Sequence, residues 1–115
     1  KRLKVGAWYN RPLDDPLSCC RLNTVATEFS SQGLELDAAL VAWGSDLLRV
    51  DGTWSMHMSR GTRGRLHNPL QLRKNVYRVL LTRGRDGSVV YVPEDKCLNE
   101  LWDFLLSLGF RELTV

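Results

Sequence analysis

The sequence predicts an α/β protein in which helices flank a small, mostly parallel sheet. Two segments are apolar without the alternation of a half-exposed strand, which is typical of strands covered on both faces. Two others place apolar residues at helical spacing. In chain order the elements are strand, strand, helix, strand and helix, as in a layered α/β domain. A parallel sheet this small leaves its edges open, which favours a fragment of a larger domain, or half of a two-domain protein.

The first half of the chain contains the first two strands. Residues 21–29 (RLNTVATEF) combine β-branched side chains with partial alternation, so we expect a strand there, with a short helix as the alternative. Residues 34–43 (LELDAALVAW) are continuously apolar from Ala38 onward, as in a strand buried on both faces. Residues 3–9 are a candidate edge strand, followed by a loop rich in proline and aspartate.

A helix and a strand follow in the second half. The helix is expected over residues 69–82, with Asn68 as the N-cap and Pro69 at the first helical position. Its apolar residues recur at helical spacing: Leu72, Val76, Val79 and Leu80. Residues 88–92 (SVVYV) predict a short strand after a turn at residues 86–87.

The last element is the clearest amphipathic helix, and Gly109 provides its C-terminal stop. Its apolar stripe consists of Leu98, Leu101, Trp102, Leu105 and Leu106. Between the second strand and the first helix, residues 46–68 are rich in Arg, Gly, Thr and His and predict a long loop. Loops of that length in compact domains are usually functional or disordered.

Composition and charge narrow the function classes. At 115 residues the chain is one domain or less, and 43 % hydrophobic with 25 % charged residues excludes a disordered, collagen-like or coiled-coil protein. Apolar runs are too short to cross a membrane. A net charge of +3 permits contact with nucleic acid without requiring it. The odd number of cysteines, two of them adjacent, predicts reduced thiols in a cytoplasmic protein, and their spacing indicates no metal site.

Residues 30–37 (SSQGLELD) form a first candidate site. Gly33 allows a sharp turn or the close approach of a ligand to the backbone. Gln32 can both donate and accept hydrogen bonds, and Glu35 can accept from hydroxyls such as those of a ribose. The alternative is a polar turn containing a bulge glycine, and the residues alone leave both interpretations open.

Residues 77–85 (YRVLLTRGR) form a second candidate site at the end of a predicted helix. Cations near a helix C-terminus are stabilising, which by itself explains Arg83 and Arg85. The functional alternative is that the rigid helix end directs a guanidinium group toward a phosphate, whose oxygens it matches in geometry. Arg78 and Arg85 could each bind phosphate or a neighbouring carboxylate.

The long loop offers a third candidate site. Its aromatic and basic side chains could line a path for single-stranded nucleic acid, with a plain solvated loop as the alternative. The side chains in question are Trp54, Arg60, Arg63 and Arg65. His57 and His67 in the same loop have no metal-like partners and are expected to be solvated. Three further tryptophans are expected to serve packing: Trp8, Trp43 and Trp102.

Taken together and in order, these segments resemble a known family. SSQGLELD is similar to motif V of superfamily 1 helicases, and NVYRVLLTRGRDG resembles their motif VI, in which a helix ends in a Thr-Arg pair. With VAWGSDLLR and VVYVP added, the chain from about Trp8 to Leu108 resembles the schlafen-group-3-like DNA/RNA helicase domain family. The resemblance implies a partial RecA-like three-layer fold over residues 1–115, as the C-terminal RecA-like domain of an NTP-driven motor.

The resemblance also implies roles for single residues. Arg83 falls on the motif VI arginine, which in related helicases reaches the γ-phosphate and stabilises charge on the transferring phosphoryl group. Glu35 matches a motif V glutamate that contacts the nucleotide sugar in some relatives. The other residues implied to bind nucleotide are Gln32, Gly33 and Arg78, and Ser31 is the implied contact with DNA or RNA.

Two positions depart from the family pattern. Phe29 stands where many relatives have histidine, and Gly84 stands where alanine is commoner, which would loosen a helix end by up to about 1 kcal/mol. The chain also lacks a GxxxxGK[ST] loop and an acidic magnesium motif. ATP and magnesium would therefore be bound mainly by an N-terminal RecA-like half outside this chain.

Two other functions are alternatives to the helicase interpretation. One is a non-catalytic nucleic-acid or protein-binding module on a RecA-like fold, suggested by the arginines at positions 60–65. The other is a metal-dependent nuclease using Glu35 and Asp37, which lacks a suitably placed lysine and a third ligand.

Overall fold

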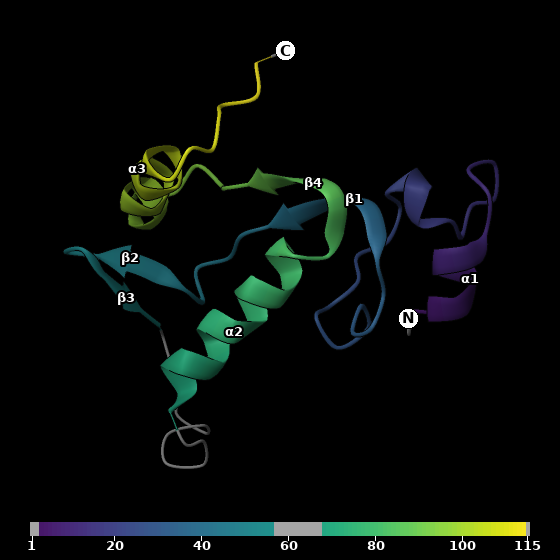
Figure 1. Cartoon of the computed structure of the whole chain (residues 1–115), viewed down its shortest axis with the longest axis horizontal. Helices are drawn as coiled ribbons and strands as arrows, with labels where there is room; N and C mark the ends of the chain where they lie inside the picture. Colours follow the sequence, from purple (N-terminus) through teal and green to yellow (C-terminus); the bar gives the residue numbers. More distant parts are fainter. Residues whose placement is uncertain (1–2, 57–67, 115) are drawn as a thin grey trace. The chain divides into compact units, whose positions relative to one another are not determined.

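The computed structural model describes residues 3–56 and 68–114. The chain divides into two compact units, Lys1–Glu35 and Leu36–Val115 (Figure 1). The second unit is mixed α/β, with a parallel pair of strands flanked by helices, and is consistent with a partial RecA-like fold.

In the first unit, both predicted strands are wrong. Residues 3–9 contribute to helix α1 (Val5–Asn10), which buries Trp8, and the Asn10 side chain donates a hydrogen bond of 2.9 Å to the Gly6 carbonyl one turn back. The segment 21–29 begins at the end of the short 3₁₀ helix η1 (Cys19–Arg21) and is mostly irregular up to a turn that starts at Glu28.

Local side-chain hydrogen bonds explain why no strand forms there. The Thr27 hydroxyl accepts a hydrogen bond from the Ser30 backbone N–H at 3.3 Å, and the Thr27 carbonyl accepts one from Ser31 at 3.0 Å. Short polar side chains compete in this way with the ladder of a sheet. Leu22 also adopts a left-handed conformation (φ 54°), which interrupts an extended segment.

The sheet of the second unit confirms the two other predicted strands. Strand β1 (Leu36–Ala42) pairs in parallel with β4 (Gly84–Tyr91), with Leu40 opposite Val89. β4 begins earlier than predicted, because the expected turn at residues 86–87 lies inside the strand. There the register shifts: the pairing advances from Gly84 to Gly87 on β4 while it advances from Leu36 to Ala38 on β1.

The expected burial of β1 on both faces is confirmed for one face only. Val41 is buried, whereas Leu40 is 57 % exposed. Its partner Val89 and the neighbouring Tyr91 are also exposed on β4. A face of the parallel pair that carries apolar side chains is therefore uncovered in the described part of the chain.

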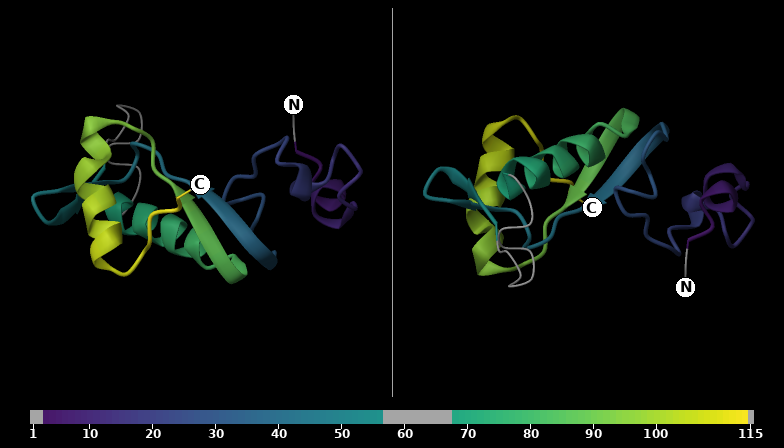
Figure 2. Two further views of the ribbon diagram at one scale, coloured as in Figure 1. Left: turned by 90° about the horizontal axis from the view of Figure 1, so that it is seen from above. Right: turned by 90° about the horizontal axis from the view of Figure 1, so that it is seen from below.

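Both predicted helices of the second unit are confirmed. Helix α2 (Pro69–Leu81) is capped by Asn68, whose side chain accepts a hydrogen bond from the Gln71 N–H at 3.3 Å. Helix α3 (Asn99–Ser107) follows the 3₁₀ turn η2 (Lys96–Leu98). It ends at Gly109 (φ +102°), with the paired C-terminal hydrogen bonds of a Schellman motif. In Figure 2, α3 is the nearer helix in the view from above and α2 is the nearer helix in the view from below.

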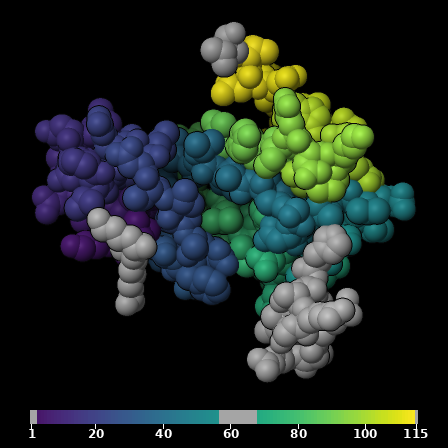
Figure 3. All heavy atoms as spheres, turned by 180° about the vertical axis from the view of Figure 1, so that it is seen from behind, coloured from purple at the N-terminus to yellow at the C-terminus, as the bar shows by residue number. Residues whose placement is uncertain are grey.

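The predicted long loop contains a hairpin. Strands β2 (Leu48–Val50) and β3 (Thr53–Ser55) pair antiparallel around Asp51 and Gly52, both of which have positive φ, as a tight two-residue hairpin turn requires. Glu100 of α3 accepts hydrogen bonds from the N–H groups of both turn residues, at 2.9 and 2.8 Å. The space-filling view shows the hairpin beside the segment leading into α3 (Figure 3).

The core of the second unit lies between the hairpin, α2 and α3. Its buried members are Trp43, Leu47, Leu48, Tyr77, Leu98, Leu101 and Leu105. Trp54 packs onto this core, stacked at 6.3 Å from Trp43 and edge-on at 5.5 Å from Phe104. Trp54 thus contributes to packing rather than to an exposed loop. The packing role expected of Trp43 is confirmed, and all three cysteines are unpaired. No helix in the described ranges is long and apolar enough to cross a membrane.

Candidate functional site

The junction between α2 and β4 lies beside the start of β1. The Leu36 backbone N–H donates a hydrogen bond of 3.0 Å to the Arg83 carbonyl. Because β1 and β4 are parallel, both strands begin at this end of the sheet. The Arg83 backbone is therefore held by an ordered helix on one side and a paired strand on the other.

The Thr82–Arg83 pair closes the last turn of α2. The Thr82 hydroxyl donates to the carbonyls of Arg78 and Val79, both at 3.0 Å, and the Arg83 Nε donates to the Val79 carbonyl at 3.3 Å. These bonds satisfy carbonyls that a helix end leaves without an intrahelical partner. The half-buried Arg83 side chain is thus directed along the helix end.

The two remaining arginines of this segment differ from each other. Arg85 forms an ion pair with Asp37 across the sheet at 2.7 Å and a longer one with Asp86 at 3.4 Å. Of the two alternatives for Arg85, phosphate or carboxylate, the structure thus shows the carboxylate. Arg78 is exposed, and its guanidinium has no partner among the described residues.

The SSQG segment lies in the first unit. Gly33 adopts φ +79°, a left-handed conformation that glycine favours, so the predicted sharp turn is confirmed. Gln32 and Glu35 are exposed, and the Glu35 carbonyl accepts a hydrogen bond from the Tyr9 hydroxyl at 2.9 Å. Ser31 is buried, and its hydroxyl donates to the Glu28 carbonyl at 3.4 Å. The chain passes directly from Glu35 into β1.

Sequence reasoning missed a hydrogen-bonded cluster at the other end of β1. Asp46 accepts a hydrogen bond from the Tyr77 hydroxyl at 2.5 Å and forms an ion pair with Arg73 at 2.9 Å. The Tyr77 hydroxyl in turn accepts from the Gly44 N–H at 3.1 Å. Burial and the bond to Asp46 raise the pKa of Tyr77 far above its ordinary value. The sequence signal for this cluster was the spacing of Arg73 and Tyr77, which lie one helical turn apart on α2.

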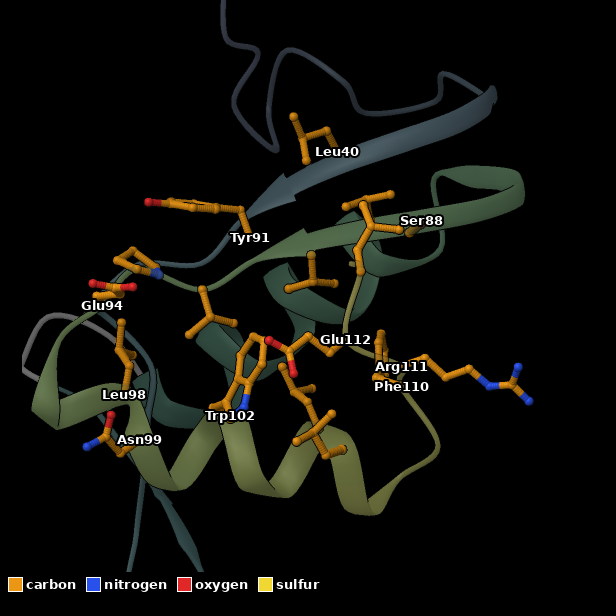
Figure 4. Close-up of a pocket in the computed structure, with 17 residues that line it drawn as sticks. Leu40, Ser88, Tyr91, Glu94, Leu98, Asn99, Trp102, Phe110, Arg111 and Glu112 are labelled. Carbon is orange, nitrogen blue, oxygen red and sulfur yellow. The ribbon is translucent and has the colours of Figure 1, made fainter. Parts of the chain in front are cut away.

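A groove of about 890 Å³ lies between the open face of the strand pair, α3 and the C-terminal segment (Figure 4). Its apolar lining includes Leu40, Tyr91, Leu98, Trp102 and Phe110. Arg111 is the single cation among its lining residues, so the groove lacks the charge expected of a phosphate site. Arg78 and Arg83 do not line it.

The remaining candidates are the basic residues of the predicted long loop and the carboxylates of the nuclease interpretation. Arg60, Arg63 and Arg65, together with His57 and His67, lie outside the described residues. Within residues 3–56 and 68–114, no group of three or more His, Cys, Asp or Glu side chains is arranged to hold a metal ion. Asp37 is engaged by Arg85, which gives the nuclease interpretation no set of ligands in this part of the chain.

Comparison with known proteins finds a family model that matches most of the chain. The sequence model of the family described as Schlafen group 3, DNA/RNA helicase domain matches residues 4–94, a range that includes both candidate segments and ends before α3. No curated protein and no solved structure matches the chain significantly.

Proposed function

Because this chain belongs to the Schlafen group 3 DNA/RNA helicase domain family, we propose that it acts as the C-terminal RecA-like half of a superfamily 1 helicase-like NTPase. The observation that carries the proposal is the Thr82–Arg83 pair at the junction of α2 and β4, beside the start of β1. This junction follows the helix named as motif VI, and β1 follows the segment named as motif V.

Arg83 is the proposed arginine finger. Its guanidinium group would reach the γ-phosphate of ATP bound to the N-terminal RecA-like half and stabilise the charge that develops during phosphoryl transfer. An arginine suits this role because its planar donors match phosphate oxygens and it remains charged. The anchored backbone at position 83 supports the proposal, since a fixed starting point reduces the entropy lost on positioning the side chain.

The motif V segment is the proposed contact with nucleotide and nucleic acid. Exposed Glu35 would accept hydrogen bonds from the nucleotide sugar, and Gln32 beside Gly33 would contact the nucleotide. Arg78 would contribute charge toward the phosphates. Ser31 is buried, so it would affect nucleic-acid binding through the turn that its hydroxyl stabilises. Basic contacts to the strand would come from Arg60, Arg63 and Arg65.

ATP and magnesium would be held mainly outside this chain. ATP supplies the phosphoryl group, and magnesium bound with it neutralises phosphate charge. The described residues fit neither group alone, because they offer no acidic cluster and the sequence has no phosphate-binding loop. This chain would contribute the arginine and the sugar contact.

Hydrolysis of ATP stimulated by nucleic acid tests the proposal in the intact protein. Arg83→Ala should lower the stimulated rate on the order of 10³-fold or more. Loss of the hydrogen bond from the Arg83 Nε to the Val79 carbonyl should by itself cost only about 1 kcal/mol of folding stability. Arg85→Ala is the matched control, because Arg85 is two residues away and engaged by Asp37. Near wild-type turnover in Arg83→Ala would refute the assigned role.

The alternative is a binding module without catalysis. It is favoured by the exposed Arg78, which has no side-chain partner within residues 3–56 and 68–114, and by the arginines at positions 60–65. This function predicts that the chain alone binds single-stranded DNA or RNA with an affinity that falls steeply as salt rises. Absence of binding at low salt would exclude it.

A further inference from the structure

Helix α2 is held beside β1 by hydrogen bonds at both ends of that strand. At the amino end of β1, the Leu36 N–H donates to the carbonyl of Arg83, just beyond the last turn of α2. At the carboxyl end, the Tyr77 hydroxyl of α2 is bonded to Gly44 and Asp46, in the segment that follows β1. α2 therefore runs antiparallel to β1 along its length, as expected of a helix that leads back to a parallel strand.

The contact at the carboxyl end of β1 comes from one face of α2. The Tyr77 hydroxyl accepts from the Gly44 N–H at 3.1 Å and donates to Asp46 at 2.5 Å. Arg73 forms an ion pair with the same carboxylate at 2.9 Å. Residues four apart are neighbours on the surface of a helix. Two polar contacts one turn apart on the same face restrict both the rotation of α2 about its axis and its position along that axis.

The hydroxyl of Tyr77 supplies a restraint that the apolar contacts of α2 do not. The Tyr77 ring stacks on Trp43 with centroids 4.1 Å apart, and Leu70 and Leu81 of α2 pack against the same core. Apolar burial is non-directional, whereas a hydrogen bond weakens steeply when its angle changes. Packing therefore holds α2 on the core, and the hydroxyl determines at which rotation and height the helix is held.

The placement of α2 in turn determines where Arg83 lies. Arg83 follows Tyr77 by less than two helical turns, and α2 is continuous up to Leu81. The Thr82 hydroxyl, which donates to the carbonyls of Arg78 and Val79, extends the hydrogen-bonded helix end to the residue before Arg83. A small rotation at Tyr77 is therefore transmitted to the junction of α2 and β4. Misplacement of a group by about 1 Å can cost on the order of 10²-fold in rate even when its cause is remote from the chemistry.

We propose that Tyr77 is a positioning residue for the arginine finger: its hydroxyl holds α2 at the carboxyl end of β1 and so sets the place from which Arg83 reaches the γ-phosphate. This inference rests on the proposed function of Arg83. Tyr77 acts through Arg83 and not on the nucleotide. Because the arginine stabilises charge that develops only during phosphoryl transfer, loss of the Tyr77 hydroxyl should lower kcat and leave the KM for ATP unchanged.

ATP hydrolysis stimulated by single-stranded DNA or RNA tests this role in the intact protein, with circular dichroism to establish that each variant is folded. Tyr77→Phe should lower kcat about 10-fold or more and change the KM for ATP by less than about twofold. In the Arg83→Ala background the same substitution should have no further effect, because its target is already absent. Glu100→Ala is the matched control: it removes hydrogen bonds between α3 and the hairpin, leaves α2 untouched and should keep the wild-type kcat.

Hydrogen exchange without nucleotide gives a second measurement. The Leu36 N–H should exchange faster in Tyr77→Phe than in Glu100→Ala, because its acceptor is the Arg83 carbonyl at the end of α2. Asp46→Ala removes the acceptor of the hydroxyl and should have the same effects as Tyr77→Phe, so it decides the question if Tyr77→Phe does not fold. Asp46→Asn should restore most of the turnover, since an amide oxygen still accepts from the hydroxyl.

Three results would overturn the positioning role and leave the proposed function intact. One is a folded Tyr77→Phe variant with wild-type kcat when Arg83→Ala has lost its turnover. Another is a loss of kcat by the same factor with and without Arg83, which would mean a general loss of structure. The third is unchanged exchange of the Leu36 N–H in Tyr77→Phe. Turnover retained in Arg83→Ala, in contrast, contradicts the proposed function itself, and the positioning role is then wrong as well.

Discussion

The α-carbon of Gly84 lies against the carbonyl oxygen of Gly87, so closely that a Cβ at position 84 would overlap that oxygen. Gly84 is the first residue of β4, and the irregular pairing with β1 folds the backbone of residues 84–87 back on itself. The expectation that this glycine loosens a helix end is therefore wrong. α2 ends before it, and the glycine is required by a close backbone approach within the strand.

Gly84→Ala should lower the free energy of unfolding by about 1–3 kcal/mol, because a backbone atom rather than a flexible side chain meets the new methyl group. Gly87→Ala is the matched control, since its Cβ would meet nothing within 4 Å. Urea denaturation of the two variants compares them directly. Equal stabilities would show that the backbone at Gly84 relaxes freely.

The parts of the fold that sequence predicted are those determined by neighbouring residues. Asn68 and Pro69 define the start of α2, Gly109 defines the end of α3, and the apolar run after Ala38 defines β1. The hairpin was missed although Asp51-Gly52 is a strong turn signal, because its strands have only three residues each. Short strands give too little alternation for a pattern to be recognised.

The candidate site likewise has one part that the sequence could predict and another that it could not. The Thr82–Arg83 pair could be found from sequence, since it follows directly on a predicted helix. The partner of Arg85 could not be found, because only the parallel pairing of β1 with β4 brings Asp37 to it. The cluster of Asp46, Arg73 and Tyr77 also depends on tertiary contacts between residues about 30 positions apart, which no local pattern reports.

Glu100 should be the main hydrogen-bonding link between α3 and the hairpin, beside the packing of Trp54 on Phe104. Glu100→Ala removes acceptors from the N–H groups of Asp51 and Gly52, at a cost of about 1–2 kcal/mol, and should accelerate amide exchange at both positions. Glu100→Gln keeps one carbonyl acceptor, so its stability and its amide exchange rates should fall between those of Glu100→Ala and the wild type. The matched control is Asp103→Asn, an exposed acidic residue of the same helix. Equal exchange in Glu100→Ala and the wild type would contradict the link.

Leu101 should be the most costly leucine of α3 to truncate. It is fully buried in the core, so Leu101→Ala should lower the free energy of unfolding by about 2–5 kcal/mol. Leu106 is 39 % exposed on the same helix, and Leu106→Ala should cost about 1 kcal/mol or less. Thermal or urea unfolding measures both. A larger loss of stability in Leu106→Ala than in Leu101→Ala would mean that the face of α3 carrying Leu106, rather than the face carrying Leu101, packs against the core.

Tyr77→Phe should destabilise the protein while keeping its ring stacked at 4.1 Å on Trp43. The change removes the acceptor for the Gly44 N–H and the donor to Asp46, at a cost of about 1–3 kcal/mol near neutral pH. Asp46→Asn tests the same contact from the other side, because an amide oxygen still accepts from the hydroxyl but no longer forms an ion pair with Arg73. Asp46→Asn should therefore lower the free energy of unfolding by less than Tyr77→Phe if the hydrogen bond from the hydroxyl contributes more than the ion pair.

The advantage of Tyr77 over phenylalanine should also shrink at high pH. In the unfolded chain this hydroxyl ionises near its ordinary pKa of about 10, whereas burial and Asp46 keep the folded pKa far above that value. Above about pH 10 the unfolded state therefore binds fewer protons than the folded state, and stability falls by up to about 1.4 kcal/mol per pH unit. Lysines and other tyrosines titrate in both proteins and cancel in the difference. Urea denaturation of the wild type and Tyr77→Phe at about pH 9 and about pH 11 measures the difference in their free energies of unfolding. The same difference at both pH values would mean that Tyr77 ionises as easily in the folded protein as in the unfolded chain.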